Sequence, residues 1–319
     1  MAVYTDIGFD DLGAVLAAYD LGSPRSFKGI AEGVENSNFF LQTDRGTFIL
    51  TLYEKRVSAD DLPFFLSLLE HLAGKGIACP QPVHTRDGAQ SIVLKGRPAA
   101  LLTFLDGLSL SRPRPSHCAA AGAALAALHG AGRDFAARRA NSLSVTGWHR
   151  LARAIGPRAD SVETGFARLI AENVSALEDS WPAGLPTGVI HADLFPDNVL
   201  FMNGKVSGLI DFYFACDDFL AYDLAVMINA WCFDPGGRFS RGRSQNLIAA
   251  YTNKRRLSVG EISALPVLAR GAALRFLLTR LQDWLEHDTS ALVRPKDPRE
   301  FARRLRFHAQ VQSAAEYGI

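Results

Sequence analysis

The stretch HADLFPDN, residues 191–198, decides the fold prediction because it places a base, a potential metal ligand and a turn in one short segment. The β-branched segment 187–190 precedes it and favours an extended chain. On an extended chain His191 and Asp193, two positions apart, would point the same way. Pro196 then bends the chain. We therefore expect a loop that presents two polar side chains on one side.

A β-hairpin is predicted directly after this loop. Asn203-Gly204 favours a two-residue type I′ turn between two apolar segments. Regular pairing from that turn would place Asn198 opposite position 209, with Asp211 two residues further along the same face. The hairpin would thus bring an amide and a carboxylate together at its open end.

A base beside two oxygen ligands is the arrangement that Mg²⁺-assisted phosphoryl transfer requires. The pattern H-x-D-x-x-x-x-N, followed by a hairpin and by Ile210-Asp211-Phe212, matches the order of the kinase catalytic loop and metal motif. This interpretation makes Asp193 the base and Asn198 and Asp211 the metal ligands.

Two other interpretations of the same residues stay open. Each side chain on its own is compatible with an ordinary loop cap or turn. Alternatively, His191 and Asp193 could form a transition-metal pair in a metallohydrolase. That site would need further ligands, and His129 and His149 show no ligand spacing to this segment.

Composition narrows the class of protein. A chain of 319 residues suits two lobes, and a net charge of +1 argues against a nucleic-acid groove or an anionic membrane surface, which favours a small-molecule substrate. The four cysteines form no C-x-x-C pair. No signal peptide and no apolar run of the ~18 residues that a membrane span needs are found, so we expect a cytoplasmic enzyme.

The pattern of elements changes along the chain. Residues 1–105 show extended segments and one apolar-faced helix, including an expected strand at 81–84, which predicts a small antiparallel-sheet lobe that covers a nucleotide. Residues 106–319 are dominated by helix signals and contain the loop and hairpin. We therefore predict an α+β, bilobal, protein-kinase-like fold, with a ligand in the cleft between the lobes.

The segments 191–198, 210–212 and 125–129 together resemble the aminoglycoside phosphotransferase and choline kinase superfamily. Within it, longer runs are similar to bacterial homoserine kinases of the protein-kinase-like type. These runs are 33–39, 210–216, 222–225, 229–233 and 270–281. The resemblance implies ATP-dependent phosphorylation of the side-chain hydroxyl of L-homoserine to O-phospho-L-homoserine, a step of threonine biosynthesis.

The resemblance also assigns roles. Asp193 matches the catalytic base, Asn198 and Asp211 match the Mg²⁺ ligands, and His191 would brace the loop. For ATP, the loop at Gly33 with Asn36 and Asn38 would cover the phosphates, and Thr103 to Leu105 would reach adenine. These residues are Asp193, His191, Asn198, Asp211, Gly33, Asn36, Asn38, Thr103 and Leu105.

One departure from the kinase pattern concerns the third strand, which usually carries a lysine that pairs the phosphates and a helix glutamate. Thr51 occupies that position here. A hydroxyl cannot replace an ammonium charge, so another cation would be needed, and Lys55 at the strand end is the nearest candidate.

An amino-acid acceptor needs an anion for its ammonium and a cation for its carboxylate. Asp217, Asp218 and Asp223 are the candidate anions, and Arg275 and Arg280 are the candidate cations. Choline is the alternative acceptor, since Tyr213, Phe214 and Trp231 could form an aromatic cage; methylthioribose is a third. A catalytically inactive kinase-like binding module is the alternative of another class.

Overall fold

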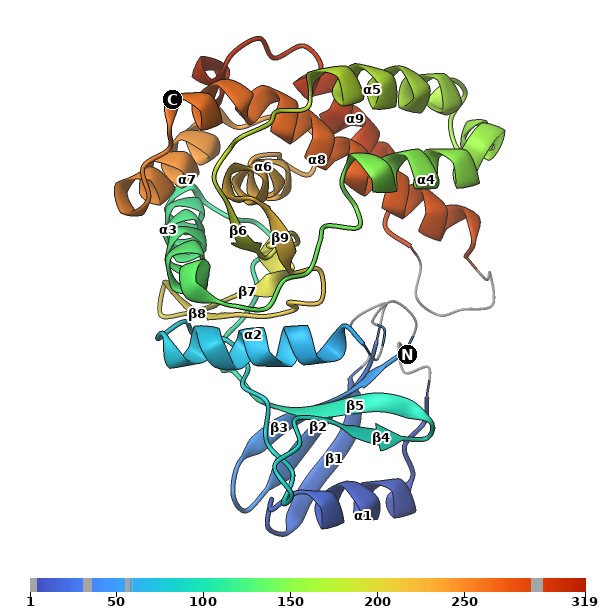
Figure 1. The fold of residues 1–319 in the computed structure, drawn as a ribbon, viewed down its shortest axis with the longest axis vertical. Coiled ribbons are helices and arrows are strands. Elements are labelled where there is room, and N and C mark those ends of the chain that lie inside the picture. The colour runs from blue at the N-terminus through green and yellow to red at the C-terminus, as the bar shows by residue number, and fades with distance from the viewer. Residues whose placement is uncertain (1–4, 31–35, 55–57, 59, 288–294) are drawn as a thin grey trace. The chain divides into compact units, whose positions relative to one another are not determined.

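The computed structural model describes residues 5–30, 36–54, 58, 60–287 and 295–319. The chain divides into two compact units, the first ending at Asp106 and the second beginning at Gly107. The first unit is built on an antiparallel sheet, and the second is mainly helical (Figure 1). The predicted α+β class is therefore confirmed.

An antiparallel sheet with the strand order β1-β2-β3-β5-β4 forms the first unit. The elements of this unit are α1 (Phe9–Ala18), β1 (Pro24–Ile30), β2 (Asn36–Thr43), β3 (Thr47–Tyr53), α2 (Leu62–Gly74), β4 (Ile92–Leu94) and β5 (Arg97–Thr103). Leu41, Leu50 and Leu101 form a buried core with Leu12 and Val15 of α1. Since side chains alternate along a strand, the residues between these leucines belong to the opposite face of the sheet.

The stretch 81–84 runs beside β5 but forms no regular strand, contrary to the prediction. The backbone N–H of Val83 donates to Leu101 O at 2.8 Å, yet Pro82 makes only an isolated bridge with Leu102. Proline has no N–H, so it interrupts the ladder at this point.

Helices build most of the second unit, and two short antiparallel pairs of strands lie among them (Figure 1). Its elements are α3 (Pro115–Ala131), α4 (Val145–Ile155), α5 (Phe166–Ser180), β6 (Thr187–Ile190), β7 (Val199–Met202), β8 (Lys205–Leu209), β9 (Cys216–Phe219), α6 (Leu220–Trp231), α7 (Arg241–Lys254), α8 (Val259–Leu285) and α9 (Arg299–His308). Strand β6 pairs with β9, and β7 pairs with β8.

Helix α8 is long and apolar enough to cross a membrane by composition alone. However, 67% of its most apolar window is buried inside the protein, and its neighbours α6 and α9 pack along it. Burial of this kind is typical of the core helix of a globular unit.

The hairpin β7–β8 has the predicted turn and an unpredicted bulge. Asn203 and Gly204 have φ of 51° and 76°, the positive values that a type I′ turn requires. Ser207 is the extra residue of a β-bulge, so Val199 rather than Asn198 lies opposite Leu209. The regular register predicted from the turn is therefore wrong by one residue at the open end, since a β-bulge places two residues opposite one.

Helices α3 and α7 approach each other closely at Gly122. A Cβ atom at this position would lie 2.3 Å from the backbone oxygen of Leu247, whereas a Cβ at Gly130 of the same helix would meet nothing within 4 Å. Glycine at 122 thus allows the contact between the two helices.

We predict that Gly122→Ala lowers the free energy of unfolding by ~1–3 kcal/mol, because the added methyl group forces the helices apart. Gly130→Ala is the matched control and should be neutral or stabilising by up to ~1 kcal/mol, because alanine favours the helix. Urea unfolding followed by circular dichroism measures both. Equal stability of the two variants would contradict the close packing.

Candidate active site

The 191–198 loop begins where β6 ends, at Ile190. Ala192 has φ of 63°, a left-handed conformation, so the chain is not extended between His191 and Asp193. The expectation that these two side chains point the same way is therefore wrong. Instead His191 is fully buried, whereas Asp193 is only partly buried.

His191 connects the loop to the end of β8. Its Nε2 donates to the backbone oxygen of Ile210 at 3.0 Å, and its Nδ1 accepts from the N–H of Asp193 at 3.3 Å. This pair of bonds requires a neutral ring protonated on Nε2. Burial lowers the pKa of His191, which favours the same neutral form. The imidazole thus braces the loop against the end of β8.

Asp193 and Asn198 are in direct contact across the loop. The Asn198 Nδ2 donates to the backbone oxygen of Asp193 at 2.8 Å and to its Oδ2 at 3.2 Å. Because the amide nitrogen makes both bonds, the amide oxygen is the atom left to coordinate a cation. The contact fixes the carboxylate and the amide as one unit.

Asp211 follows the last paired residue of the hairpin. The N–H of Ile210 donates to Asn198 O at 3.0 Å, so the bulge places Asp211 immediately beyond the partner of Asn198. Asp211 is exposed and has φ of 65°. One amide oxygen and one exposed carboxylate thus lie at the open end of the hairpin. Among the described residues, no cluster of three His, Cys, Asp or Glu side chains could hold a metal by itself.

Asp223 is fully buried on α6 and forms hydrogen bonds with the backbone at the start of the loop. Its two oxygens accept the N–H groups of His191 at 2.7 Å and of Ala192 at 2.8 Å, and His129 Nε2 lies 3.1 Å from Oδ2. Burial would raise the pKa of Asp223, but the hydrogen bonds that the carboxylate accepts from His129 and from the backbone N–H of His191 outweigh burial and lower the pKa. The prediction that Asp223 binds the acceptor ammonium is therefore wrong, because the carboxylate is fully buried and both of its oxygens are bonded within the protein.

Arg275 is also buried, at 2% exposure, contrary to its predicted role as a carboxylate ligand. Its Nη1 donates to the backbone oxygen of Ala192. The guanidinium carbon lies 4.4 Å from the ring centre of Phe276 and 5.2 Å from that of Phe214. The guanidinium of Arg275 thus bonds to the backbone at one edge and lies close to two aromatic rings, so it contacts the protein rather than an acceptor.

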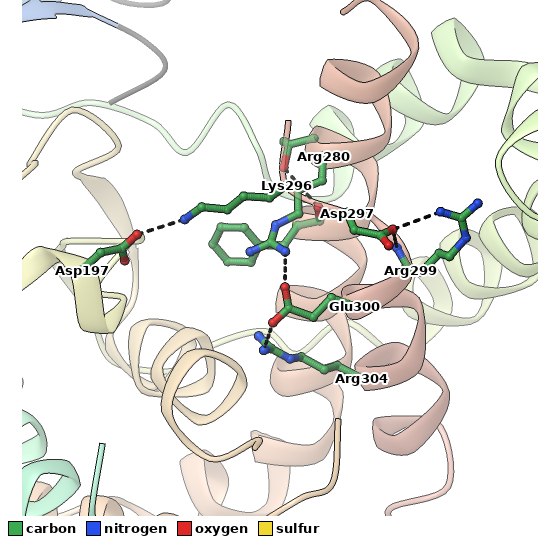
Figure 2. Close-up of polar contacts among 9 residues, drawn as sticks. Asp197, Arg280, Lys296, Asp297, Arg299, Glu300 and Arg304 are labelled. Atoms are coloured by element: carbon green, nitrogen blue, oxygen red, sulfur yellow. Dashed lines mark hydrogen bonds and ion pairs between the residues drawn. The ribbon is translucent and has the colours of Figure 1, made fainter. Parts of the chain in front are cut away.

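Arg280 belongs to an ion-pair cluster between α8 and α9, which Figure 2 shows. Its guanidinium pairs with Glu300 at 2.5 Å and lies 4.4 Å from the ring centre of Phe301. Glu300 also pairs with Arg304. Arg280 therefore already pairs with a carboxylate of the protein. The prediction that Arg280 binds the carboxylate of the acceptor is wrong for this reason.

Asp217 and Asp218 lie side by side on β9 but differ in their partners. Asp217 accepts from the Arg138 guanidinium at 3.0 Å and from the N–H of Arg139 at 2.8 Å. Asp218 accepts from Asn141 Nδ2 at 2.6 Å and from the next backbone N–H at 2.7 Å. Burial raises the pKa of Asp218, although both hydrogen bonds oppose the rise. Its partners are neutral, so it remains suited to meet a cation.

Lys296 reaches the 191–198 loop from a distant part of the chain. Its Nζ lies 2.9 Å from Asp197 Oδ2 (Figure 2) and 5.7 Å from the ring centre of Phe195. Sequence analysis missed this contact because 99 positions separate the two charged residues, and no local spacing links them.

In the first unit, Asn38 lies opposite Thr51 on neighbouring strands. Thr51 is buried, and its Oγ1 donates to Asn38 Oδ1 at 2.8 Å. The position at which kinases carry a lysine thus holds a small neutral side chain paired with an amide. Lys55 lies outside the described residues.

The other predicted nucleotide ligands lie at strand ends of this unit. Asn36 is buried, and its Oδ1 accepts from the N–H of Glu54 at 3.4 Å. Thr103 Oγ1 accepts from the N–H of Gln81 at 2.9 Å, and Leu105 is partly buried beyond the end of β5. Gly33 lies outside the described residues.

Comparison with known families identifies the family to which the chain belongs. Residues 26–257 match the phosphotransferase enzyme family, so the match spans most of the chain and includes the loop, the hairpin and α6. The chain belongs to the phosphotransferase enzyme family. The resemblance inferred from the loop and metal motif is thereby confirmed, and the chain is an enzyme that transfers phosphate to a hydroxyl group.

Curated relatives of this phosphotransferase match along its whole length. The homoserine kinase of Xanthobacter autotrophicus is 59% identical over 319 residues, which cover 100% of this chain and 99% of that protein. The homoserine kinase of Rhodospirillum rubrum is also 59% identical, with the same coverage.

Solved structures share the fold of this phosphotransferase at much lower identity. An amicoumacin kinase in complex with AMP-PNP, Ca²⁺ and Ami matches with a TM-score of 0.71 at 14% identity, covering 94% of this chain and 92% of that one. A microcompartment-associated aminopropanol kinase matches with a TM-score of 0.67 at 16% identity, covering 95% and 94%.

For this phosphotransferase we predict that Asp223→Asn lowers the free energy of unfolding by ~3–5 kcal/mol, because it leaves buried N–H groups and His129 without their charged partner. Asp217→Asn, on the neighbouring strand and paired with an exposed arginine, is the control and should change it by ~1 kcal/mol or less. Chemical unfolding of both variants provides the measurement. If the two variants lose the same stability, Asp223 does not have the supporting role described above.

Proposed function

We propose that this phosphotransferase is a homoserine kinase, which transfers the γ-phosphoryl group of ATP to the side-chain hydroxyl of L-homoserine and so serves threonine biosynthesis in the cytoplasm. The observation that carries the proposal is the 59% identity with curated homoserine kinases over the whole chain. The contact between Asp193 and Asn198 beside Asp211 supports phosphoryl transfer as the chemistry.

Asp193 is proposed as the base. Its partly buried carboxylate, held by Asn198, orients the acceptor hydroxyl and accepts its proton as the hydroxyl oxygen bonds to the γ-phosphorus of ATP. The bond between that phosphorus and the β–γ bridging oxygen breaks, and ADP leaves with the electron pair. His191 takes no part in proton transfer in this mechanism, because burial keeps it neutral and both of its nitrogens are hydrogen-bonded.

Mg²⁺ is the metal that fits the donor set of this site. An amide oxygen of Asn198 and the exposed carboxylate of Asp211 are hard oxygen ligands, and Mg²⁺ in kinases takes its other ligands from phosphates and water. Bound there, the cation would neutralise charge that develops on the transferred phosphoryl group. For the nucleotide, we propose that the loop at Gly33 with Asn36 and Asn38 covers the phosphates and that Thr103 to Leu105 contact adenine.

Asp218 is the best candidate for the acceptor ammonium. It is a partly buried carboxylate with neutral hydrogen-bond partners, whereas Asp217 already pairs with Arg138. The choline alternative needs an aromatic cage that includes Trp231. However, Trp231 is fully buried and its Nε1 donates to Leu194 O at 2.8 Å, so it cannot face a ligand.

We predict that Asp193→Asn reduces kcat by at least ~10²-fold while nucleotide affinity stays near that of the wild type, because only the base is lost. Asp197→Asn in the same loop is the matched control and should retain activity, since Asp197 is exposed and pairs with Lys296. Steady-state kinetics and nucleotide titration measure both. Near-wild-type turnover of Asp193→Asn with chemistry rate-limiting would remove Asp193 from the mechanism.

For the substrate we predict the highest kcat/KM with L-homoserine among L-homoserine, D-homoserine, L-serine, choline and methylthioribose, each with Mg-ATP. A site built to bind both charged ends of an acceptor can reject analogues by ~10⁴-fold. A higher kcat/KM with choline or methylthioribose would overturn the substrate, and the absence of turnover with every acceptor would favour a binding module.

A further inference from the structure

We propose that Arg275 is a positioning residue for phosphoryl transfer, which holds the peptide before Asp193 in its left-handed conformation and so aims the base. The choice of assay rests on the proposed function, but the inference itself concerns the geometry of the loop. The family match ends at residue 257, so it assigns nothing to Arg275 on α8.

The first observation is the backbone strain at Ala192. A residue with a Cβ atom at φ of 63° is strained relative to an ordinary conformation, and this conformation persists only if its surroundings enforce it. Here both polar groups of the residue are held by buried charged side chains. The N–H donates to Asp223 at 2.8 Å, and the carbonyl oxygen accepts from Arg275. Asp193 is the next residue, so any relaxation of this peptide turns the carboxylate away.

The second observation is the environment of the guanidinium. Arg275 is 2% exposed and lies near the rings of Phe276 and Phe214, at 4.4 Å and 5.2 Å. A planar cation can lie against aromatic rings and donate from its edge at the same time, which a lysine ammonium cannot do. The rings thus fix the direction of the bond to Ala192.

The third observation is that Arg275 contacts both halves of the site. Ala192 precedes Asp193, whereas Phe214 follows Asp211 by three residues, and Asp211 is itself left-handed with φ of 65°. One side chain therefore touches the loop of the base and the segment of the metal ligand. This arrangement couples the direction of the base to the position of the metal ligand.

The experiment is a double-mutant cycle of Arg275→Met with Asp193→Asn, measured as kcat with Mg-ATP and L-homoserine well below the melting temperature. We expect Arg275→Met to reduce kcat by ~10²-fold in the wild-type background, the effect of misplacing a reacting group by about 1 Å. We expect little further loss in the Asp193→Asn background, because the residue acts through that carboxylate. KM for both substrates should change little.

Arg275→Lys should recover part of the lost kcat, since it keeps a donor for Ala192 O. Arg270→Met is the matched control on the same helix, where Arg270 donates to Asn173 Oδ1 at 2.8 Å, and its kcat should equal that of the wild type. If Arg275→Met does not fold, as judged by circular dichroism, Arg275→Lys replaces it in the cycle with an expected loss of ~10-fold.

An equal loss of kcat in both backgrounds, or no loss in either, would overturn the inference and leave Arg275 with a structural role alone. Absence of turnover by the wild-type enzyme with L-homoserine would instead overturn the proposed function. In that case the cycle is repeated with the acceptor that is turned over.

Discussion

The carboxylate of Asp223 is the group on which the rest of the site depends. It accepts two consecutive backbone N–H groups, those of His191 and Ala192, and it pairs with the buried ring of His129. His129 in turn contacts the hydroxyl of Tyr251 at 2.8 Å, and Arg255 donates to that hydroxyl at 3.2 Å. The start of the loop is therefore fixed by hydrogen bonds that run through α6, α3 and α7.

In the second unit the side chains that support the loop are more deeply buried than those proposed to take part in the chemistry. The supporting groups, His191, Asp223 and Arg275, are at most 2% exposed. Of the groups proposed for chemistry, Asn198 is 8% exposed, Asp193 is partly buried and Asp211 is exposed. A buried charged side chain such as Asp223 or Arg275 holds a strained peptide firmly, because breaking its hydrogen bond would leave a charge without a partner in a low-dielectric interior. Stiff loop geometry and accessible carboxylates can therefore coexist within a few residues.

The parts of the site that rest on short-range chemistry could be predicted from the sequence. Asn203-Gly204 specifies its turn through the φ values that only a few residues tolerate. The bulge at Ser207 could not be predicted from the turn, and a segment outside the hairpin lies close to it. A Cβ at Gly107 would lie 2.3 Å from Ser207 Oγ, and Leu108 pairs with Phe201 of β7.

Long-range partners explain the predictions that failed. Asp223 and Arg275 carry charges that suit a ligand, but their partners lie 31 and 83 positions away. One signal for Asp223 was available: residues 221–228 are apolar on all sides of the helix except at this position, and a lone carboxylate in such a helix is buried and paired. No comparable signal marks Arg275, since its role follows from where α8 packs.

The bulge at Ser207 lets the two ends of the hairpin follow different registers. Towards the turn Met202 pairs with Lys205, and towards the site Asn198 bonds to Ile210, with the extra residue Ser207 between the two registers. Removing one residue at the bulge would make the ladder regular and leave the pairing of Asn198 with Ile210 unchanged. The hairpin can thus lose one residue at the bulge without a change in the position of Asp211 relative to Asn198.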